Sequence, residues 1–225
     1  LSEAGFEAPD TMRLSSAPWP ALLIAARAPS VIIAKPAAPR RAIICTEPGC
    51  AALAAALNAT LQRGLENSMD TAIAEAARAA GIDVSGARAV AELPYDFTRK
   101  CLSVLVEDAP GAAMEAGAGA GRVSDRTLIT KGAVDPVLSR CTDARGADGA
   151  PRPMAEARSG AITAVERLAG EGMRVLALAE KPLPGAEAVS AEDEAGLTLI
   201  GLLAFADPVK PDAAGTIADF AAAGV

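Results

Sequence analysis

The sequence predicts an α/β fold of the α+β type, in which an antiparallel sheet is flanked by helices. Three observations lead to this fold class. Two segments of helical composition follow each other closely, at residues 51–63 and directly after Asn67. Residues 101–107 show the two-residue periodicity of a strand, and a second strand pattern follows at residues 126–130. Helix and strand patterns then alternate to the end of the chain, which is typical of a sheet covered by helices.

The first 50 residues are rich in proline, so long helices are not expected there. Only short strands, at residues 22–25 and 31–34, fit the pattern of this segment. The composition changes abruptly after Cys50, where residues 51–63 are good helix formers. This helix is expected to end at Gly64, because glycine commonly follows the last helical turn.

A second helix is expected directly after Asn67, whose side chain suits an N-cap. Asp70 then lies in the first turn, near the positive end of the helix dipole. Met69 and Ile73 are four residues apart, so both are expected on the inner face. Gly81 is expected to end the helix.

The remaining segments supply the sheet and the other helices. Strands are predicted at residues 87–93, 101–107, 126–130, 173–179 and 197–205, and helices at 134–141, 154–170 and 212–223. Leu102, Val104 and Val106 are expected on one face of their strand, which should pair with residues 126–130 as a hairpin. The alanine- and glycine-rich stretch 109–121 is read as a mobile connection, and the acidic stretch 182–196 as a polar loop.

Composition excludes several classes of function. A net charge of −7 gives no general attraction to nucleic acid or to an anionic membrane surface. The sequence has no histidine, which excludes Ser/His/Asp triads, Cys/His dyads and histidine-bearing zinc sites. The four cysteines lack the spacing of a zinc knuckle or a redox motif, so reduced structural thiols are favoured over metal ligands. No apolar stretch is long enough to cross a bilayer, and no secretory signal is recognised at the start.

Five segments carry recognisable motifs, in this order: LN at 57–58 with GLENSMDTAI at 64–73, LPYDFTRKCLSV at 93–104, KGA at 131–133, GMRVLA at 172–177 and FADPVK at 205–210. Together, in this order, they resemble the nucleotide-binding domain of P-type cation-transporting ATPases. The first two segments are most similar to those of bacterial magnesium-transporting ATPases. Val134 and Asp135 replace the Pro-Glu that usually follows KGA, and Val209 replaces the second proline of the family's Asp-Pro-Pro.

The resemblance implies a nucleotide-binding site for ATP, with Mg²⁺ entering as the ATP complex. Phe97 corresponds to an aromatic platform for adenine, although a phenylalanine that packs in the core is the alternative. Lys131 corresponds to a lysine on the floor of the pocket, where the small Gly132 lets a ligand approach, and a surface lysine is its alternative. Asp70 corresponds to an acceptor for the adenine amino group, and Arg174 to an arginine that reaches the β-phosphate. The alternatives for these two are a helix-dipole carboxylate and a surface arginine at a strand end.

The same resemblance predicts the domain organisation. Residues 1–50 form a proline-rich segment without a recognisable motif, and residues 51–204 form the nucleotide-binding domain. Asp207 and Pro208 correspond to a hinge, and a plain turn that ends a strand is their alternative. Residues 205–225 are therefore expected to be the hinge and first helix of an incomplete, haloacid-dehalogenase-like phosphorylation domain.

The phosphorylated aspartate of the family lies in an Asp-Lys-Thr-Gly-Thr motif, and this motif is absent from the sequence. We therefore expect no catalytic residue in this chain, and ATP binding without turnover. The parent is expected to be a pump in the cell membrane that imports Mg²⁺, with this region on the cytoplasmic side and soluble by itself. Its partners are then ATP and the phosphorylation, actuator and transmembrane domains of the pump. A stand-alone nucleotide-binding or scaffold module and a non-functional gene remnant are the alternatives.

Overall fold

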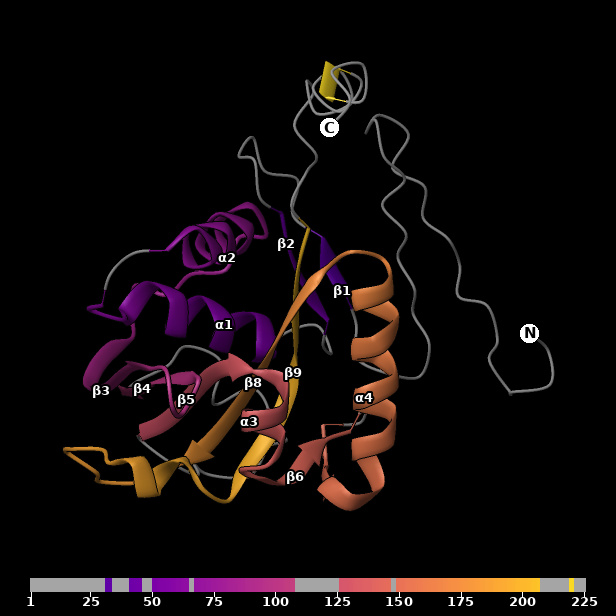
Figure 1. Cartoon of the computed structure of the whole chain (residues 1–225). Coiled ribbons are helices and arrows are strands. Elements are labelled where there is room, and N and C mark those ends of the chain that lie inside the picture. The colour runs from indigo at the N-terminus through magenta and orange to yellow at the C-terminus, as the bar shows by residue number, and fades with distance from the viewer. Residues whose placement is uncertain are drawn as a thin grey trace.

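A computed structural model describes residues 31–33, 41–45, 50–64, 67–107, 126–146, 149–206 and 219–220 (Figure 1). Its strands are β1 (Val31–Ile33), β2 (Arg41–Cys45), β3 (Arg88–Asp96), β4 (Cys101–Glu107), β5 (Arg126–Ala133), β6 (Cys141–Arg145), β7 (Pro151–Pro153), β8 (Arg174–Pro182) and β9 (Leu197–Ala206). Its helices are α1 (Cys50–Leu61), α2 (Ser68–Ala79), α3 (Val134–Leu138), α4 (Met154–Gly170) and the short 3₁₀ helix η1 (Ala191–Glu194).

The nine strands of the described residues belong to one sheet. Seven of them follow the order β1-β2-β9-β8-β5-β4-β3, and each pair of neighbours in this order is antiparallel. The strand β6 lies parallel to β9 and pairs with β7 on its other side. The predicted antiparallel sheet flanked by helices is therefore confirmed, and β4 pairs with β5 as expected.

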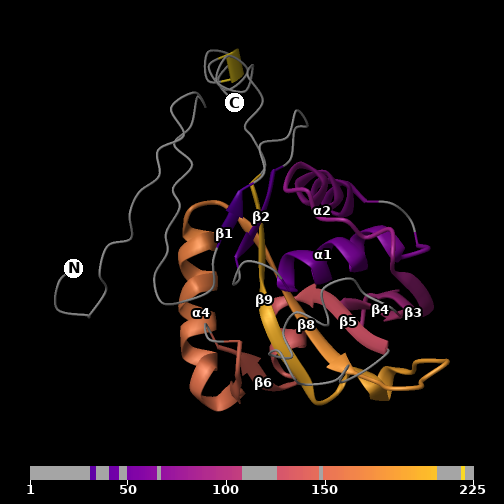
Figure 2. The ribbon, with the colours of Figure 1, turned by 180° about the vertical axis from the view of Figure 1, so that it is seen from behind.

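Helices cover both faces of the sheet. Figures 1 and 2 show α1 and α2 lying together on one side of the sheet and α4 running along the other. The periodicity of the strands explains why two cores form, since successive side chains point to opposite faces. Leu102 and Val104 of β4 contact the core beneath α1 and α2, whereas Cys101 belongs to the core beneath α3 and α4.

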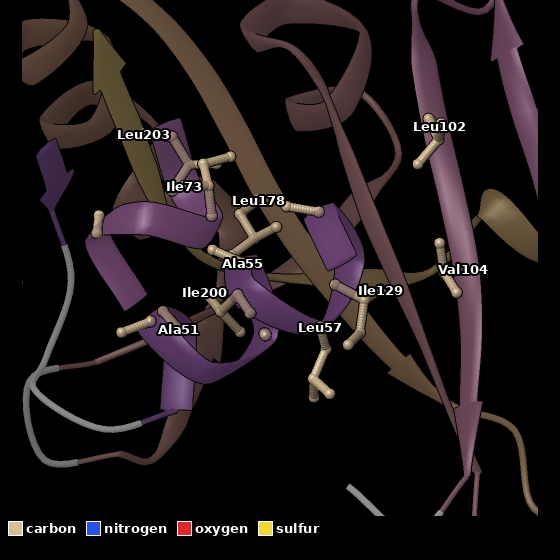
Figure 3. Close-up of a cluster of buried hydrophobic side chains, with 14 of the residues drawn as sticks. Ala51, Ala55, Leu57, Ile73, Leu102, Val104, Ile129, Leu178, Ile200 and Leu203 are labelled. Carbon is tan, nitrogen blue, oxygen red and sulfur yellow. The ribbon is translucent and has the colours of Figure 1, made fainter. Parts of the chain in front are cut away.

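The core beneath α1 is built mainly from small and aliphatic side chains (Figure 3). Ala51 and Ala55 are fully buried, and because alanine is small, the helix backbone can lie close to the sheet. Leu57 and Ile73, from α1 and α2, fill the space between the helices and the strands. The amide of the buried Asn58 donates a hydrogen bond of 2.8 Å to a β5 carbonyl, which fixes α1 to the centre of the sheet.

The helix α2 begins and ends as its sequence predicts. The side chain of Asn67 accepts hydrogen bonds from the backbone amides of Met69 and Asp70, at 2.9 and 3.0 Å, and so caps the helix. Gly81 follows the end of the helix with a φ of 74°, a left-handed conformation that favours glycine. Ile73 is fully buried, which confirms the predicted inner face.

Several expected elements differ from the structure. The helix expected at residues 134–141 ends at Leu138, because residue 141 already begins β6 alongside β9. The strands β2, β6 and β7 were not predicted, and the expected polar loop 182–196 contains η1. The strand expected at 31–34 is present as β1, whereas the strand expected at 22–25 lies outside the described residues.

Other predictions fall on residues that the structure does not describe. The connection 109–121, the hinge residues Asp207 and Pro208, and all but residues 219–220 of the last expected helix are among them. The domain boundaries at residues 50 and 204 and the start of a phosphorylation domain stay predictions. Across these predicted boundaries, β2, which precedes residue 50, pairs along its whole length with β9, and β9 continues past residue 204 to Ala206.

Candidate functional site

Asp70 and Lys131 form a buried ion pair between α2 and β5. The ammonium of Lys131 donates to one carboxylate oxygen of Asp70, and their side chains are only 7% and 5% exposed. The second carboxylate oxygen accepts hydrogen bonds from the side-chain amides of Gln62 and Asn67. The N-cap of α2 therefore also orients Asp70, and both carboxylate oxygens already have partners in the free protein.

The environment of Lys131 affects its protonation. Burial lowers the pKa of the ammonium, while the charge and hydrogen bond of Asp70 oppose this shift. The alternative of a surface lysine, left open by the sequence, is excluded by this burial. A buried cation with a single carboxylate partner is also a group that an anionic ligand could approach, if the ligand competes with Asp70.

At Gly132 the β5 backbone lies close to the turn between β3 and β4. A Cβ atom added at Gly132 would be 2.5 Å from the Cβ of Cys101 and 2.5 Å from the carbonyl oxygen of Lys100. The following residue, Ala133, donates a backbone hydrogen bond of 2.9 Å to the same carbonyl. The absence of a side chain at Gly132 thus lets β5 pack against the turn that carries Phe97.

Phe97 is the first residue of that turn, which spans residues 97–100, and 86% of its surface is exposed. Its ring meets the ring of Tyr95 edge to face, with centroids 5.4 Å apart. The carboxylate of Asp96 accepts hydrogen bonds from the amides of Thr98 and Arg99, at 2.9 and 2.7 Å, and so shapes the turn. The alternative of a phenylalanine that packs in the core is excluded, because the ring is largely exposed to solvent.

Arg174 begins β8 and lies apart from the other candidate residues. It is exposed and stands opposite Phe205 of β9. Lys131 stands opposite Leu178, four residues further along β8. At about 3.3 Å per residue, the backbones of Arg174 and Leu178 are about 13 Å apart. The described residues thus bring together Asp70, Lys131, Gly132 and the Phe97 turn, whereas Arg174 is an exposed arginine at the start of a strand.

Sequence reasoning missed a buried acidic residue beneath the Phe97 turn. The side chain of Glu194 is fully buried, and it forms an ion pair with Arg99 at 2.5 Å. Ser103 donates a hydrogen bond of 2.6 Å to the same carboxylate oxygen and contacts Thr130 at 2.8 Å. The sequence signal for Glu194 is weak: it is one of several acidic residues before β9, and only its closeness to that apolar strand distinguishes it.

The two free cysteines of the described residues, Cys101 and Cys141, have thiols of low reactivity. Burial, together with the nearby charge of Glu194, raises the pKa of Cys101 to about 11. Burial also raises the pKa of Cys141, to about 12. Their thiols therefore stay protonated near neutral pH, which agrees with the expected structural role.

In the part of the chain that the structure describes, no three Cys, Asp or Glu side chains gather where they could hold a metal ion. Within the same ranges, no helix has both the length and the apolar character that crossing a membrane requires.

These observations define the class of the molecule: an α+β domain whose antiparallel sheet carries a polar site and an exposed aromatic turn at one end. The family model described as "P-type ATPase, cytoplasmic domain N" matches residues 52–212. The chain therefore belongs to this family, and the predicted family and the cytoplasmic placement of this region are confirmed.

Similar proteins include several bacterial pumps. The chain is 35% identical over 167 residues to "Magnesium-transporting ATPase, P-type 1" of Salmonella typhimurium, covering 72% of this chain and 17% of that protein. It is 33% identical over 178 residues to the protein of the same name from Escherichia coli K12, covering 75% and 18%. A "Calcium-transporting ATPase" of Bacillus subtilis is 31% identical over 143 residues, covering 63% and 14%. The chain thus spans less than a fifth of the length of these relatives.

Proposed function

We propose that this chain binds ATP, as the magnesium complex, in the manner of a domain that delivers nucleotide to a P-type cation pump. The observation that carries the proposal is the exposed ring of Phe97, 86% of which is open to solvent. Stacking on an aromatic ring suits adenine, because the base has a flat apolar face. The family and the edge-to-face contact with Tyr95, which leaves Phe97 accessible, support this role.

The charged residues nearby suit the rest of the nucleotide. Lys131 can supply positive charge at the end of β5, but only if the ligand shares it with Asp70 or replaces that carboxylate. In this proposal Asp70 approaches the adenine amino group when its pairing with Lys131 loosens. Arg174, about 13 Å further along the sheet by strand geometry, suits the phosphate end of an elongated ligand, because a guanidinium can bind two phosphate oxygens.

Magnesium enters this proposal with the nucleotide. Mg²⁺ usually keeps several waters and binds through phosphates with one or two carboxylates. The described residues offer no carboxylate cluster for it, so the phosphate oxygens are its ligands here. The metal lowers the charge of the phosphates and makes the ATP easier to bind for a chain of net charge −7.

We also propose that binding is weak and occurs without turnover. One stacking contact and one shared cation must offset the cost of immobilising a flexible ligand, which leaves a dissociation constant on the order of a millimolar. The Asp-Lys-Thr-Gly-Thr acceptor motif is absent from the sequence, so the chain offers no aspartate of this kind for phosphoryl transfer.

The role in transport belongs to a larger assembly. The names of two relatives describe magnesium transport, and the chain covers 17% and 18% of them. We propose that the chain serves a pump that moves Mg²⁺, together with phosphorylation, actuator and transmembrane domains. The similarity to the first and second motif segments of magnesium-transporting ATPases supports magnesium over calcium as the transported ion.

Calorimetric titration with MgATP of the chain and of Phe97→Ala tests the proposal. Loss of the platform should weaken binding by about 1–3 kcal/mol, or about fivefold to 150-fold in Kd. Since Phe97 is exposed, the free energy of unfolding should change by less than about 0.5 kcal/mol. The matched control is Phe220→Ala, which removes another exposed ring and should leave ATP binding unchanged. Equal affinity of folded Phe97→Ala and the unchanged chain would contradict the proposal.

A further inference from the structure

The turn that carries Phe97 rests on a carboxylate that comes from a distant part of the chain. Glu194 ends η1, more than 90 residues after the turn, and its side chain is fully buried. One carboxylate oxygen accepts hydrogen bonds from Arg99 at 2.5 Å and from Ser103 at 2.6 Å. The thiol of Cys101 lies 3.4 Å from the other oxygen. All three donors belong to the turn or to the first residues of β4.

Arg99 transmits this anchor to the turn. One of its terminal nitrogens binds Glu194, and the other donates a hydrogen bond of 2.6 Å to the carbonyl of Pro94. Its backbone amide binds the side chain of Asp96 at 2.7 Å. The guanidinium is therefore held between β3 and η1, and only 18% of the side chain is exposed.

Phe97 itself has little that could hold it. Its ring is exposed, and its ring contact in the described residues is with the half-exposed Tyr95. The direction of the ring therefore depends on the backbone of the turn, where Lys100 has a left-handed φ of 56° that few side chains adopt without support. The Arg99–Glu194 pair is the charged support beneath this backbone.

We propose that Glu194 is a positioning residue for nucleotide binding: by holding Arg99, it fixes the turn and presents Phe97 in one orientation. The inference rests on the proposed function of Phe97. Glu194 is completely covered by protein, so it acts through the turn and not by touching the ligand. A platform that is already ordered saves the entropy of ordering it on binding, and this saving corresponds to about a two- to tenfold gain in affinity.

The simple alternative is that the pair only stabilises the fold. Removing one partner of a buried ion pair leaves an uncompensated charge and destabilises the protein, whereas apolar replacement of both partners is often neutral. The informative variants are therefore Glu194→Gln, which keeps an oxygen acceptor for Arg99 and Ser103, and the double variant Arg99→Met/Glu194→Met. Glu107→Gln is the matched control, because Glu107 pairs with Arg126 at the opposite end of β4.

The first measurement needs no nucleotide. Backbone ¹⁵N relaxation should show the amides of Phe97 and Thr98 changing from rigid, with an order parameter near 0.85, to flexible, below about 0.6, in the double variant. The control should keep them rigid. A rigid turn in a folded double variant would overturn the proposal, whether or not the chain binds ATP.

The second measurement is MgATP affinity on two backgrounds. When Phe97 is present, the folded Glu194 variants should bind MgATP about two- to tenfold more weakly than the unchanged chain. When Phe97 is replaced by alanine, a further change at Glu194 should not weaken binding below that of Phe97→Ala alone. A loss of the same size on the Phe97→Ala background would show direct contact by Arg99 and overturn positioning. If the unchanged chain binds no ATP, the proposed function fails, and the relaxation measurement still decides whether Glu194 orders the turn.

Discussion

Replacing Gly132 with alanine tests the close approach of β5 to the Phe97 turn. The new Cβ would lie 2.5 Å from the Cβ of Cys101, 2.5 Å from the carbonyl oxygen of Lys100 and 2.8 Å from the Cα of Cys101. Ordinary contacts begin at 3.4 Å, so the overlap is about 0.9 Å. These atoms belong to the backbone or its first side-chain carbon and cannot rotate away, so β5 and the turn must separate.

This separation sets the size of the effect. Overpacking in a tight site costs about 1–3 kcal/mol. The backbone hydrogen bond from Ala133 to Lys100, 2.9 Å long, is weakened at the same time and contributes about 1 kcal/mol. We expect Gly132→Ala to lower the free energy of unfolding by about 2–4 kcal/mol and also to weaken ATP binding, because the turn moves.

Gly160→Ala is the matched control for this change. Gly160 lies inside α4, and no described heavy atom outside its own helix backbone lies within 4 Å of an added Cβ. Alanine there should raise the free energy of unfolding by about 0.5–1 kcal/mol, because it restricts the unfolded chain and favours the helix. Urea unfolding followed by circular dichroism measures both variants. Equal stabilisation by both alanines would refute the close contact at Gly132.

Two further predictions concern buried groups. Asp70→Asn leaves the Lys131 ammonium buried without a charged partner and should lower the free energy of unfolding by about 3–5 kcal/mol. The double variant Asp70→Asn/Lys131→Met should recover part of this loss. Urea unfolding of the single and double variants measures the coupling, and additive losses would show that the two residues are not coupled. Folding raises the pKa of Cys101 from 9.0 to about 11, so the folded state keeps a proton that the unfolded chain releases. This contribution to the free energy of unfolding is complete below about pH 9 and is lost as the pH rises towards 11. For the same reason, iodoacetamide at pH 8 should label Cys101 and Cys141 far more slowly in the folded than in the urea-unfolded chain. Mass spectrometry of the cysteine peptides measures the labelling, and equal rates would show that these thiols are not buried.

Local patterns in the sequence were enough to place several elements. The bounds of β4 and α4 agree with the ranges expected from periodicity, because each segment has a clear apolar face. The cap at Asn67 correctly places the start of α2 and the first-turn position of Asp70. The motif resemblance adds the family and the candidate site residues, which periodicity alone does not predict.

Long-range contacts could not be predicted in the same way. Asp70 and Lys131 are 61 residues apart, and nothing in their neighbouring residues shows that they neutralise each other. Glu194 looks like any solvated acid until the strands bring it beneath the turn. The strands β2 and β6 are short and add to the sheet by pairing with β9, so their stability comes from tertiary contacts that the sequence does not display.

The most direct test of the account is an NMR titration of the ¹⁵N-labelled chain with MgATP, which shows where the nucleotide binds. We expect saturating shifts, with a dissociation constant on the order of a millimolar, at the amides of the turn around Phe97 and at Lys131 and Gly132. The amides of α4, on the other face of the sheet, should stay unchanged. Shifts confined to α4, or no saturating shifts at all, would contradict the claim that this chain binds ATP at the Phe97 turn.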